Sequence, residues 1–203
     1  MLKQLLTISL ITGIALGSLV ACDADPEQSR SVVFINSFNC GVPVFSDVLE
    51  QGDDIAVTTD DYIGEDWPLV WFYNKPYNHM IITRPGGPHG DVVIESYTVA
   101  WSARSDGGAV PPVRTEYMGL KVETDDKKGG QVRLVSVQEK MFLLNDLFIA
   151  NPNAAILMNA TLTFQAREAG TDRNSTFIVT ASVQFADFII VTEDKDDPPT
   201  CNE

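Results

Sequence analysis

The sequence predicts an all-β domain in which two antiparallel sheets pack face to face, with one short helical connection. Residues 160–166 and 177–185 alternate apolar and polar side chains, which is the period of a strand with one buried and one solvated face. Clusters of Gly, Pro and Asp separate several other short apolar runs, as in domains built from many short strands. A closed barrel of the same strands is the alternative arrangement.

The size and composition of the chain suit one such domain. It has 203 residues, of which 44% are hydrophobic and 9% aromatic, so it can bury a sizeable core. No low-complexity linker or internal repeat divides it. We therefore expect one sandwich domain over residues 31–191, followed by an acidic C-terminal tail over residues 192–203.

Strands are expected wherever an apolar run lies between turn-rich segments. Residues 168–174 join the two alternating runs and are expected to form the turn of a long hairpin. Further strands are expected at residues 32–38, 55–59, 69–73, 79–83, 92–102, 118–123 and 131–137. Turn clusters are expected at residues 85–88, 105–108 and 127–130.

One short helix is expected to begin at Ser136. Glu139 follows three residues later, which matches the capping box, where each of the two side chains binds the backbone N–H of the other residue. Apolar side chains then follow at helical spacing: Met141, Leu144, Leu147 and Phe148.

Residues 1–21 have the pattern of an export signal. Lys3 supplies a positive charge, an apolar run covers residues 5–19, and small residues precede Cys22. The segment resembles the signal of bacterial lipoproteins, in which a peptidase cuts before a cysteine that then carries acyl chains such as palmitate. A membrane-spanning anchor is the alternative, but the run is shorter than the ~20 apolar residues of a span. The resemblance implies lipidation of Cys22, a lipidated tether over residues 22–30, and a domain outside the cytoplasm anchored to the inner or outer membrane of the cell envelope.

The rest of the chain resembles the immunoglobulin-like sandwich domains of uncharacterised bacterial envelope lipoproteins. Residues 42–48, 87–97 and 185–188 carry this resemblance. It implies an immunoglobulin-like β-sandwich and no particular activity.

Two cysteines remain once Cys22 carries the lipid. Because envelope compartments are oxidising, we expect Cys40 and Cys201 to form a disulfide that ties the C-terminal tail to the start of the fold. A loop of this length gives a stabilisation of up to ~5 kcal/mol in the chain-entropy description. Two unpaired thiols are the alternative.

The chain is strongly acidic, with 28 Asp and Glu residues against 14 Lys and Arg residues and a net charge of −14. This argues against nucleic acid as a partner, because such binding needs clustered cations. Residues 31–74 contain no Lys or Arg. Calcium binds groups of carboxylate oxygens, so a calcium site is one hypothesis for this stretch, and a solvated acidic face is the other. The candidate calcium ligands are Asp53, Asp54, Asp60, Asp61, Glu65 and Asp66.

An aromatic cluster overlaps the acidic stretch. The candidate ligand-binding residues are Tyr62, Trp67, Trp71, Tyr73 and Tyr77. Flat aromatic rings stack on sugar rings, and exposed Trp and Tyr anchor protein partners. In the alternative interpretation Trp67, Leu69, Trp71 and Tyr73 line the core face of one strand and pack with Trp101.

No catalytic motif stands out. The chain has no Gly-x-Ser-x-Gly sequence and no phosphate-binding glycine loop, and His79, His89 and Asp91 lack the spacing of a known metal site. We therefore expect a lipid-anchored, non-catalytic module that binds an envelope protein or a glycan, or acts structurally. A calcium-dependent carbohydrate-binding module is the alternative, and a hydrolase is the third. We expect no cofactor, and calcium is the alternative for the carbohydrate-binding module.

Overall fold

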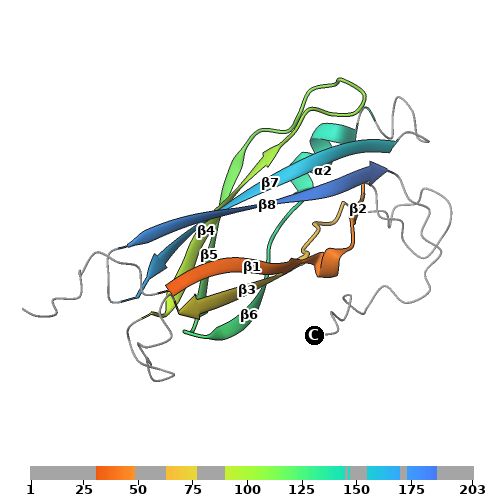
Figure 1. Ribbon diagram of the computed structural model, residues 1–203. Helices are drawn as coiled ribbons and strands as arrows, with labels where there is room; N and C mark the ends of the chain where they lie inside the picture. The colour runs from red at the N-terminus through yellow and green to blue at the C-terminus, as the bar shows by residue number, and fades with distance from the viewer. Residues whose placement is uncertain are drawn as a thin grey trace, which may run out of the picture.

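The computed structural model describes residues 31–48, 63–76, 90–144, 146, 155–169 and 173–186. These ranges contain eight strands, one 3-10 turn and one α-helix (Figure 1). In chain order they are β1 (Ser31–Phe38), η1 (Asn39–Gly41), β2 (Val44–Asp47), β3 (Leu69–Pro76), β4 (Val92–Trp101), β5 (Arg114–Val122), β6 (Asp126–Gln131), α2 (Val137–Leu144), β7 (Ala155–Glu168) and β8 (Asn174–Ala186).

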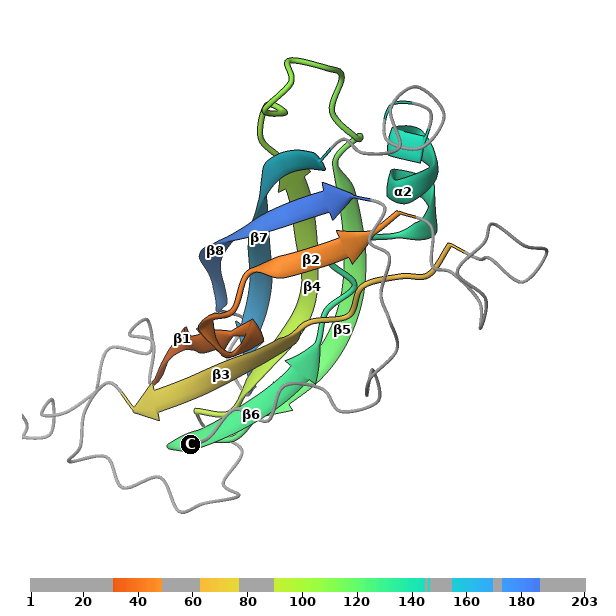
Figure 2. The ribbon, with the colours of Figure 1, turned by 90° about the vertical axis from the view of Figure 1, so that its right-hand side faces the viewer.

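The strands form two sheets that face each other. The small sheet has the order β1-β3-β6, and the large sheet has the order β2-β8-β7-β4-β5 (Figures 1 and 2). The predicted all-β sandwich with one short helix is therefore confirmed. One pairing departs from the expected antiparallel arrangement, because β2 runs parallel to β8, with Val44 opposite Val183.

The longest pairing in the described ranges is the hairpin of β7 and β8. Its register runs from Ala155 opposite Ala186 to Arg167 opposite Asn174. The predicted hairpin is thus confirmed, and its strands extend beyond the alternating runs that indicated it. Every second side chain of β7 from Ile156 onward is buried, as the period of two requires.

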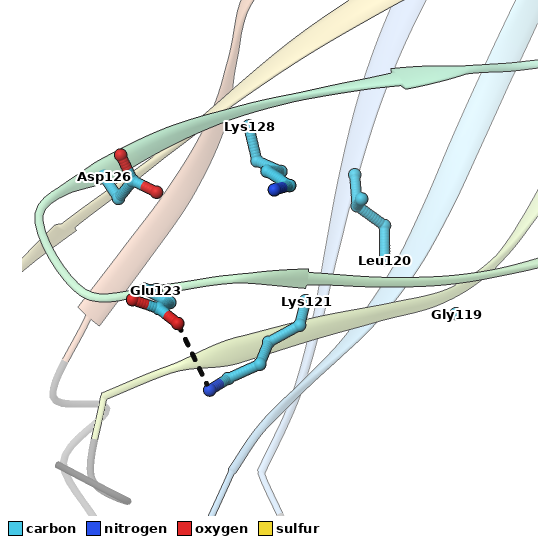
Figure 3. Close-up of a pocket in the computed structure, with 6 residues that line it drawn as sticks. All are labelled: Gly119, Leu120, Lys121, Glu123, Asp126 and Lys128. Carbon is cyan, nitrogen blue, oxygen red and sulfur yellow. Dashed lines mark ion pairs between the residues drawn. The ribbon is translucent and has the colours of Figure 1, made fainter. Parts of the chain in front are cut away.

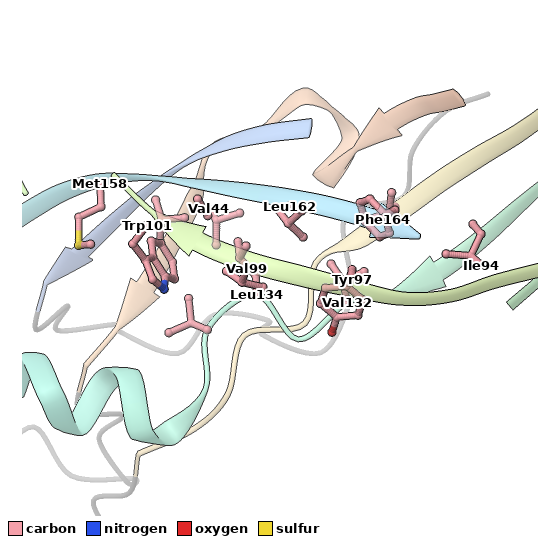
Figure 4. Close-up of a cluster of buried hydrophobic side chains, with 14 of the residues drawn as sticks. Val44, Ile94, Tyr97, Val99, Trp101, Val132, Leu134, Met158, Leu162 and Phe164 are labelled. Carbon is pink, nitrogen blue, oxygen red and sulfur yellow. The ribbon is translucent and has the colours of Figure 1, made fainter. Parts of the chain in front are cut away.

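The core lies between the two sheets. The rings of Phe72 in β3, Phe164 in β7 and Phe177 in β8 contact one another, with centroids 5.2 to 6.0 Å apart. Trp101 packs edge-on against Phe185 at 5.4 Å. Part of the buried cluster is labelled in Figure 4: Val44, Ile94, Tyr97, Val99, Trp101, Val132, Leu134, Met158, Leu162 and Phe164.

The N-terminal strand segment crosses from one sheet to the other. β1 pairs with β3 in the small sheet, and β2 pairs with β8 in the large one. The crossing is made at η1, where Asn39 and Cys40 adopt positive φ values of 44° and 54°. β2 was not expected, because its buried side chains include Ser46 and Asp47 and it therefore shows no apolar alternation.

Residues 127–130 are not a turn, as the sequence predicts, but part of strand β6. Its two glycines are explained by side chains that pack closely against the backbone, and not by a bend in the chain. A Cβ on Gly129 would lie 3.3 Å from the Trp71 ring, and a Cβ on Gly130 would lie 2.4 Å from the Met118 side chain. Glycine in a strand commonly marks such a close approach. The predicted strand at 131–137 is also wrong, since β6 ends at Gln131 and only a single bridge, from Asp66 to Val135, follows.

The helix begins with the predicted capping box. The Ser136 backbone N–H donates to Glu139 Oε2 at 2.7 Å, and the Glu139 N–H donates to Ser136 Oγ at 3.3 Å. The buried face differs from the expected one, because it contains Glu139, Lys140 and Leu143 while Met141 is exposed. The two polar residues are buried because each one meets a partner of opposite charge, which periodicity in apolar residues cannot reveal.

Several predictions concern residues outside the described ranges. These are the signal segment and tether, the strands at 55–59 and 79–83, the turn cluster at 85–88, the apolar helix positions Leu147 and Phe148, and the acidic tail. Within the ranges that are described, no helix has the length and apolar character needed to cross a membrane.

Candidate functional site

The predicted aromatic residues in the described ranges lie on the outward side of the small sheet. The buried side chains of β3 are Val70, Phe72 and Asn74. Trp71 and Tyr73 point the other way and are half-buried, and Trp67 is 48% exposed. The interpretation that places these three residues and Leu69 in the core is therefore wrong, although Trp101 is indeed buried. Because both sides of this strand carry apolar side chains, the sequence alone does not indicate which side faces the core.

The neighbouring strand adds further apolar side chains to this surface. Phe34 of β1 lies opposite Tyr73, and Val32 lies opposite Lys75. Phe34 is 39% exposed and Val32 is 47% exposed. We call this surface the aromatic face; it consists of Val32, Phe34, Trp67, Leu69, Trp71 and Tyr73.

Specific contacts fix the rings of the aromatic face. Phe34 and Tyr73 meet edge to face, with centroids 5.2 Å apart and planes at 86°. The Trp71 indole lies against Gly129, where a side chain would leave it too little room. The Tyr73 hydroxyl donates to Asp125 Oδ1 at 2.8 Å, and this hydrogen bond raises the pKa of Tyr73. The phenol therefore stays neutral at physiological pH.

One hydrogen-bond donor on the aromatic face is unused. Trp71 Nε1 is shielded from solvent and has no acceptor in the described part of the chain. Leaving a buried donor unsatisfied costs about 1–3 kcal/mol. An acceptor oxygen that reached this nitrogen would remove that cost.

Two lysines border the aromatic face. Lys127 lies opposite Tyr73 in the register of β6 and β3, and Lys75 lies two residues beyond Tyr73 on β3, so both point outward. Of the ten Lys and Arg residues in the described ranges, six form ion pairs. Lys75 and Lys127 form none there, so their charges remain available. Lys128 is also without an ion pair in those ranges, but it lies on the inward side of β6.

Two of the six predicted calcium ligands lie in the described ranges, and both are paired. Glu65 accepts a hydrogen bond from Arg133 at 3.0 Å. Asp66 accepts one from Ser46 at 2.6 Å and pairs with the fully buried Lys140 at 3.3 Å. The other four lie outside those ranges: Asp53, Asp54, Asp60 and Asp61. No group of three or more potential metal ligands occurs among the residues that the structure describes.

A buried polar network lies beneath one end of the aromatic face. Glu139, which is buried, accepts hydrogen bonds from Trp101 Nε1 at 2.7 Å and from Arg114 Nε at 3.0 Å. Arg114 of β5 also donates to the backbone carbonyls of Arg133 and Leu134. The network thus connects the large sheet to the helix and to the chain that follows β6.

Arg133 extends this network to the surface. Its guanidinium lies over the Trp67 ring, 5.9 Å from the ring centroid, and pairs with Glu65 and Glu116. Glu116 also pairs with Arg114 at 2.9 Å. Desolvation alone would raise the pKa of Glu116, but the hydrogen bonds and charges of the two arginines outweigh it and lower the pKa.

A polar pocket of about 420 Å³ opens between β5 and β6 (Figure 3). It is lined by Gly119, Leu120, Lys121, Glu123, Asp126 and Lys128. Lys121 is already paired with Asp91 at 2.7 Å and with Glu123 at 3.7 Å. The mixed charges of this pocket select no one class of ligand.

The outward side of the large sheet is of a different kind. From Asn159 to Gln165 on β7 and from Thr176 to Ser182 on β8, the outward side chains are uncharged, and most carry hydroxyl or amide groups. Asn159 accepts from Ser182 at 2.8 Å, and Gln165 accepts from Thr176 at 2.9 Å. We call this surface the hydroxyl face.

The remaining predicted residues have fewer described contacts. Cys40 lies in η1 and Cys201 lies outside the described ranges, so the disulfide between them stays a prediction. The lipidation residue Cys22 lies outside them as well. The candidate ligand-binding residues Tyr62 and Tyr77 do so too, as do His79 and His89.

Sequence reasoning missed Phe34, Lys75 and Lys127. Phe34 lies in the predicted strand 32–38, where its alternation with Val33 was a usable signal. The sequence predicts a turn at Lys127, whereas its place beside Tyr73 depends on strand β6, which the sequence does not indicate. Comparison with protein-family models, with curated proteins and with solved structures finds no match to this chain.

Proposed function

We propose that this protein is a lipid-anchored, non-catalytic module of the cell envelope that binds a glycan on its aromatic face. One observation carries the proposal: Phe34 and Val32 on β1 and Trp67, just before β3, are each more than a third exposed on the same side of the small sheet as the half-buried Trp71 and Tyr73. Sheet surfaces that face water ordinarily alternate to polar side chains. A contiguous exposed apolar surface is typical of a binding site.

The chemistry of the aromatic face favours a sugar as its ligand. A sugar ring has apolar C–H faces and a polar rim, which match flat rings bordered by hydrogen-bonding groups. The neutral phenol of Tyr73 is held in place by Asp125, and Trp71 Nε1, which is shielded from solvent, has no acceptor within the described ranges. The alternative ligand is an envelope protein, for which the same rings would serve as anchors.

We also propose that the sandwich is of the immunoglobulin-like type. The strand order supports this, because β1-β3-β6 corresponds to strands A, B and E, and β8-β7-β4-β5 corresponds to G, F, C and C′. β4 ends in the buried Trp101, as strand C of that fold carries a buried tryptophan. A fold of this kind hosts many functions, so it adds no argument about the ligand.

The anchor is tested by labelling cells with a fatty-acid analogue. We expect the label on the wild-type chain and in the membrane fraction, and neither in Cys22→Ser. Mass spectrometry of the purified chain without reduction should show Cys40 and Cys201 in one cross-linked peptide. A chain that still carries Met1 and no fatty acid would refute the anchor and with it the envelope location.

The glycan site is tested by affinity electrophoresis of the whole chain through gels that contain soluble polysaccharides. We expect at least one polysaccharide to retard the wild type, and we expect Trp71→Ala and Tyr73→Ser to weaken its binding about tenfold, which corresponds to about 1.4 kcal/mol. Ile178→Ala on the hydroxyl face is the matched control and should migrate like the wild type. Wild-type retardation in both aromatic variants would refute the site.

The calcium-dependent alternative has a separate test. Because Glu65 and Asp66 are already paired with Arg133 and Lys140, we expect millimolar calcium to leave the thermal midpoint of unfolding unchanged. A rise in the midpoint that is lost in Asp53→Asn or Asp60→Asn would favour the calcium-dependent module instead.

A further inference from the structure

We infer that the ligand of the aromatic face is a linear glycan that carries carboxylate groups. This inference rests on the proposed function and adds two properties of the ligand, its length and its charge. Each property follows from a separate feature of the small sheet.

The shape of the aromatic face determines the expected length. Trp67, Trp71 and Tyr73 follow one another along the same side of the chain, and the six residue steps from Trp67 to Tyr73 cover roughly 20 Å at about 3.3 Å per residue. Phe34 widens this line at the Tyr73 end. A single sugar ring covers only one of these side chains, so an elongated surface of this kind suits several consecutive sugar units.

The position of the free cations determines the expected charge. Lys75 and Lys127 point outward beside Tyr73 and have no ion pair within the described ranges, whereas most other cations there are already neutralised. Arg133 at the Trp67 end is neutralised by Glu65 and Glu116. Unpaired ammonium groups next to stacking rings favour sugar units that carry a carboxylate.

The net charge of −14 does not prevent such binding. Charges separated by more than about 8 Å are largely screened at physiological ionic strength, so a bound carboxylate responds mainly to its immediate neighbours. Among the described residues, Lys75, Lys127 and Asp125 lie beside Tyr73, and one Asp125 oxygen is already occupied by the Tyr73 hydroxyl. The acidic remainder of the chain lowers the rate of encounter more than it lowers the affinity.

The inference is tested by calorimetric titration of the whole chain with oligogalacturonates, which are linear and carry one carboxylate on each sugar unit. Their methyl esters have the same backbone without the charge and serve as the matched ligands. We expect the acids to bind about tenfold more tightly than the esters, as two partly exposed ion pairs allow. Affinity should also rise from the monosaccharide to longer oligomers.

The variants assign the effect to particular residues. In Lys75→Gln with Lys127→Gln, the preference for the acid over the ester should disappear while binding of the ester remains. Lys128→Gln is the matched control, because this lysine adjoins Lys127 in sequence but lies on the other side of β6, and it should keep the preference.

Each of the following outcomes would refute one part of the inference. Equal binding of acid and ester refutes the charge and leaves the proposed function standing, and equal binding of monosaccharide and oligomer refutes the length. A preference that survives in the double lysine variant refutes its assignment to these residues. If the lysine variants fail to fold, the acid and ester titrations of the wild type still decide the charge. Absence of binding to any acid, ester or other soluble polysaccharide refutes the proposed function itself.

Discussion

The two sheets of this protein present opposite kinds of surface to the solvent. The hydroxyl face of the large sheet satisfies its own polar groups across the strands, as in the pair Asn159 and Ser182. The aromatic face of the small sheet leaves large apolar rings exposed and borders them with Lys75 and Lys127, which form no ion pair in the described ranges. Both surfaces belong to one sandwich and share one core, so the fold does not impose the difference.

The comparison shows which surface requires an explanation. Threonine-rich strand surfaces are ordinary, because β-branched side chains favour strands and hydroxyl groups are well hydrated. Exposed tryptophan and phenylalanine gain nothing from hydration and carry a risk of aggregation. The small sheet is therefore the better candidate for recognition, although the large sheet is the more extensive one.

The largest expected loss of stability comes from the buried polar network and not from either outward surface. Glu139→Ala removes the acceptor of both Trp101 Nε1 and Arg114, and breaking a buried charge pair in this way typically costs about 3–5 kcal/mol. Glu95→Ala removes an exposed pair with Arg167 at the end of the hydroxyl face and should cost less than about 0.5 kcal/mol. Urea unfolding of both variants measures the difference. Similar losses of unfolding free energy in the two variants would show that the buried network stabilises the fold no more than an exposed ion pair does.

A smaller effect is expected from truncating one side chain on each surface. Trp71→Ala removes an indole that packs against Gly129, and we expect a loss of about 2 kcal/mol. Ile178→Ala, at a position that is 63% exposed, should cost less than about 1 kcal/mol. The same unfolding measurement checks both values. A greater loss of stability in Ile178→Ala than in Trp71→Ala would contradict this prediction.

The dependence of stability on pH should be traceable to Glu116. Its pKa in the folded chain lies below the ordinary value of 4.5, so the carboxylate stabilises the fold fully above that value. This contribution is lost as pH falls through the lower, folded pKa. We therefore expect Glu116→Gln to be about 1 kcal/mol less stable than wild type at neutral pH, with the difference shrinking below about pH 4. Thermal melts across this range measure it, and a constant difference would contradict the assignment.

The smallest effect is expected on the hydroxyl face. Ser182→Ala removes an exposed hydrogen bond to Asn159 and should change the free energy of unfolding by no more than about 0.5 kcal/mol. Its binding of polysaccharides should equal that of the wild type. A loss of binding here, with none in Tyr73→Ser, would move the site to the large sheet.

Local patterns in the sequence were sufficient to predict much of the fold. The hairpin of β7 and β8 follows from strict alternation around a polar turn, and the capping box of Ser136 and Glu139 follows from two residues three apart. Strand β6 was missed, because its two glycines are typical of turns in sequence and are explained only by the side chains of Trp71 and Met118 packed against them. That packing joins distant segments, which no local pattern records.

The candidate site was predicted in part, for a related reason. Trp67, Trp71 and Tyr73 were identified because they lie close together in the sequence. The sequence does not indicate which way these side chains point, because both sides of β3 are apolar. The side that faces the core is determined by Phe72, which packs against Phe164 of the large sheet. Lys127 joins the site only through the register of β6 with β3.

The parallel pairing of β2 with β8 has a mechanical consequence. The first segment of the domain is held in both sheets, by β1 in one and by β2 in the other, on either side of η1. If the chain is pulled at residue 31 and residue 186 in opposite directions along β2 and β8, their backbone hydrogen bonds bear the load together, in shear, rather than breaking one after another. A domain connected in this way is suited to withstand tension between its two ends.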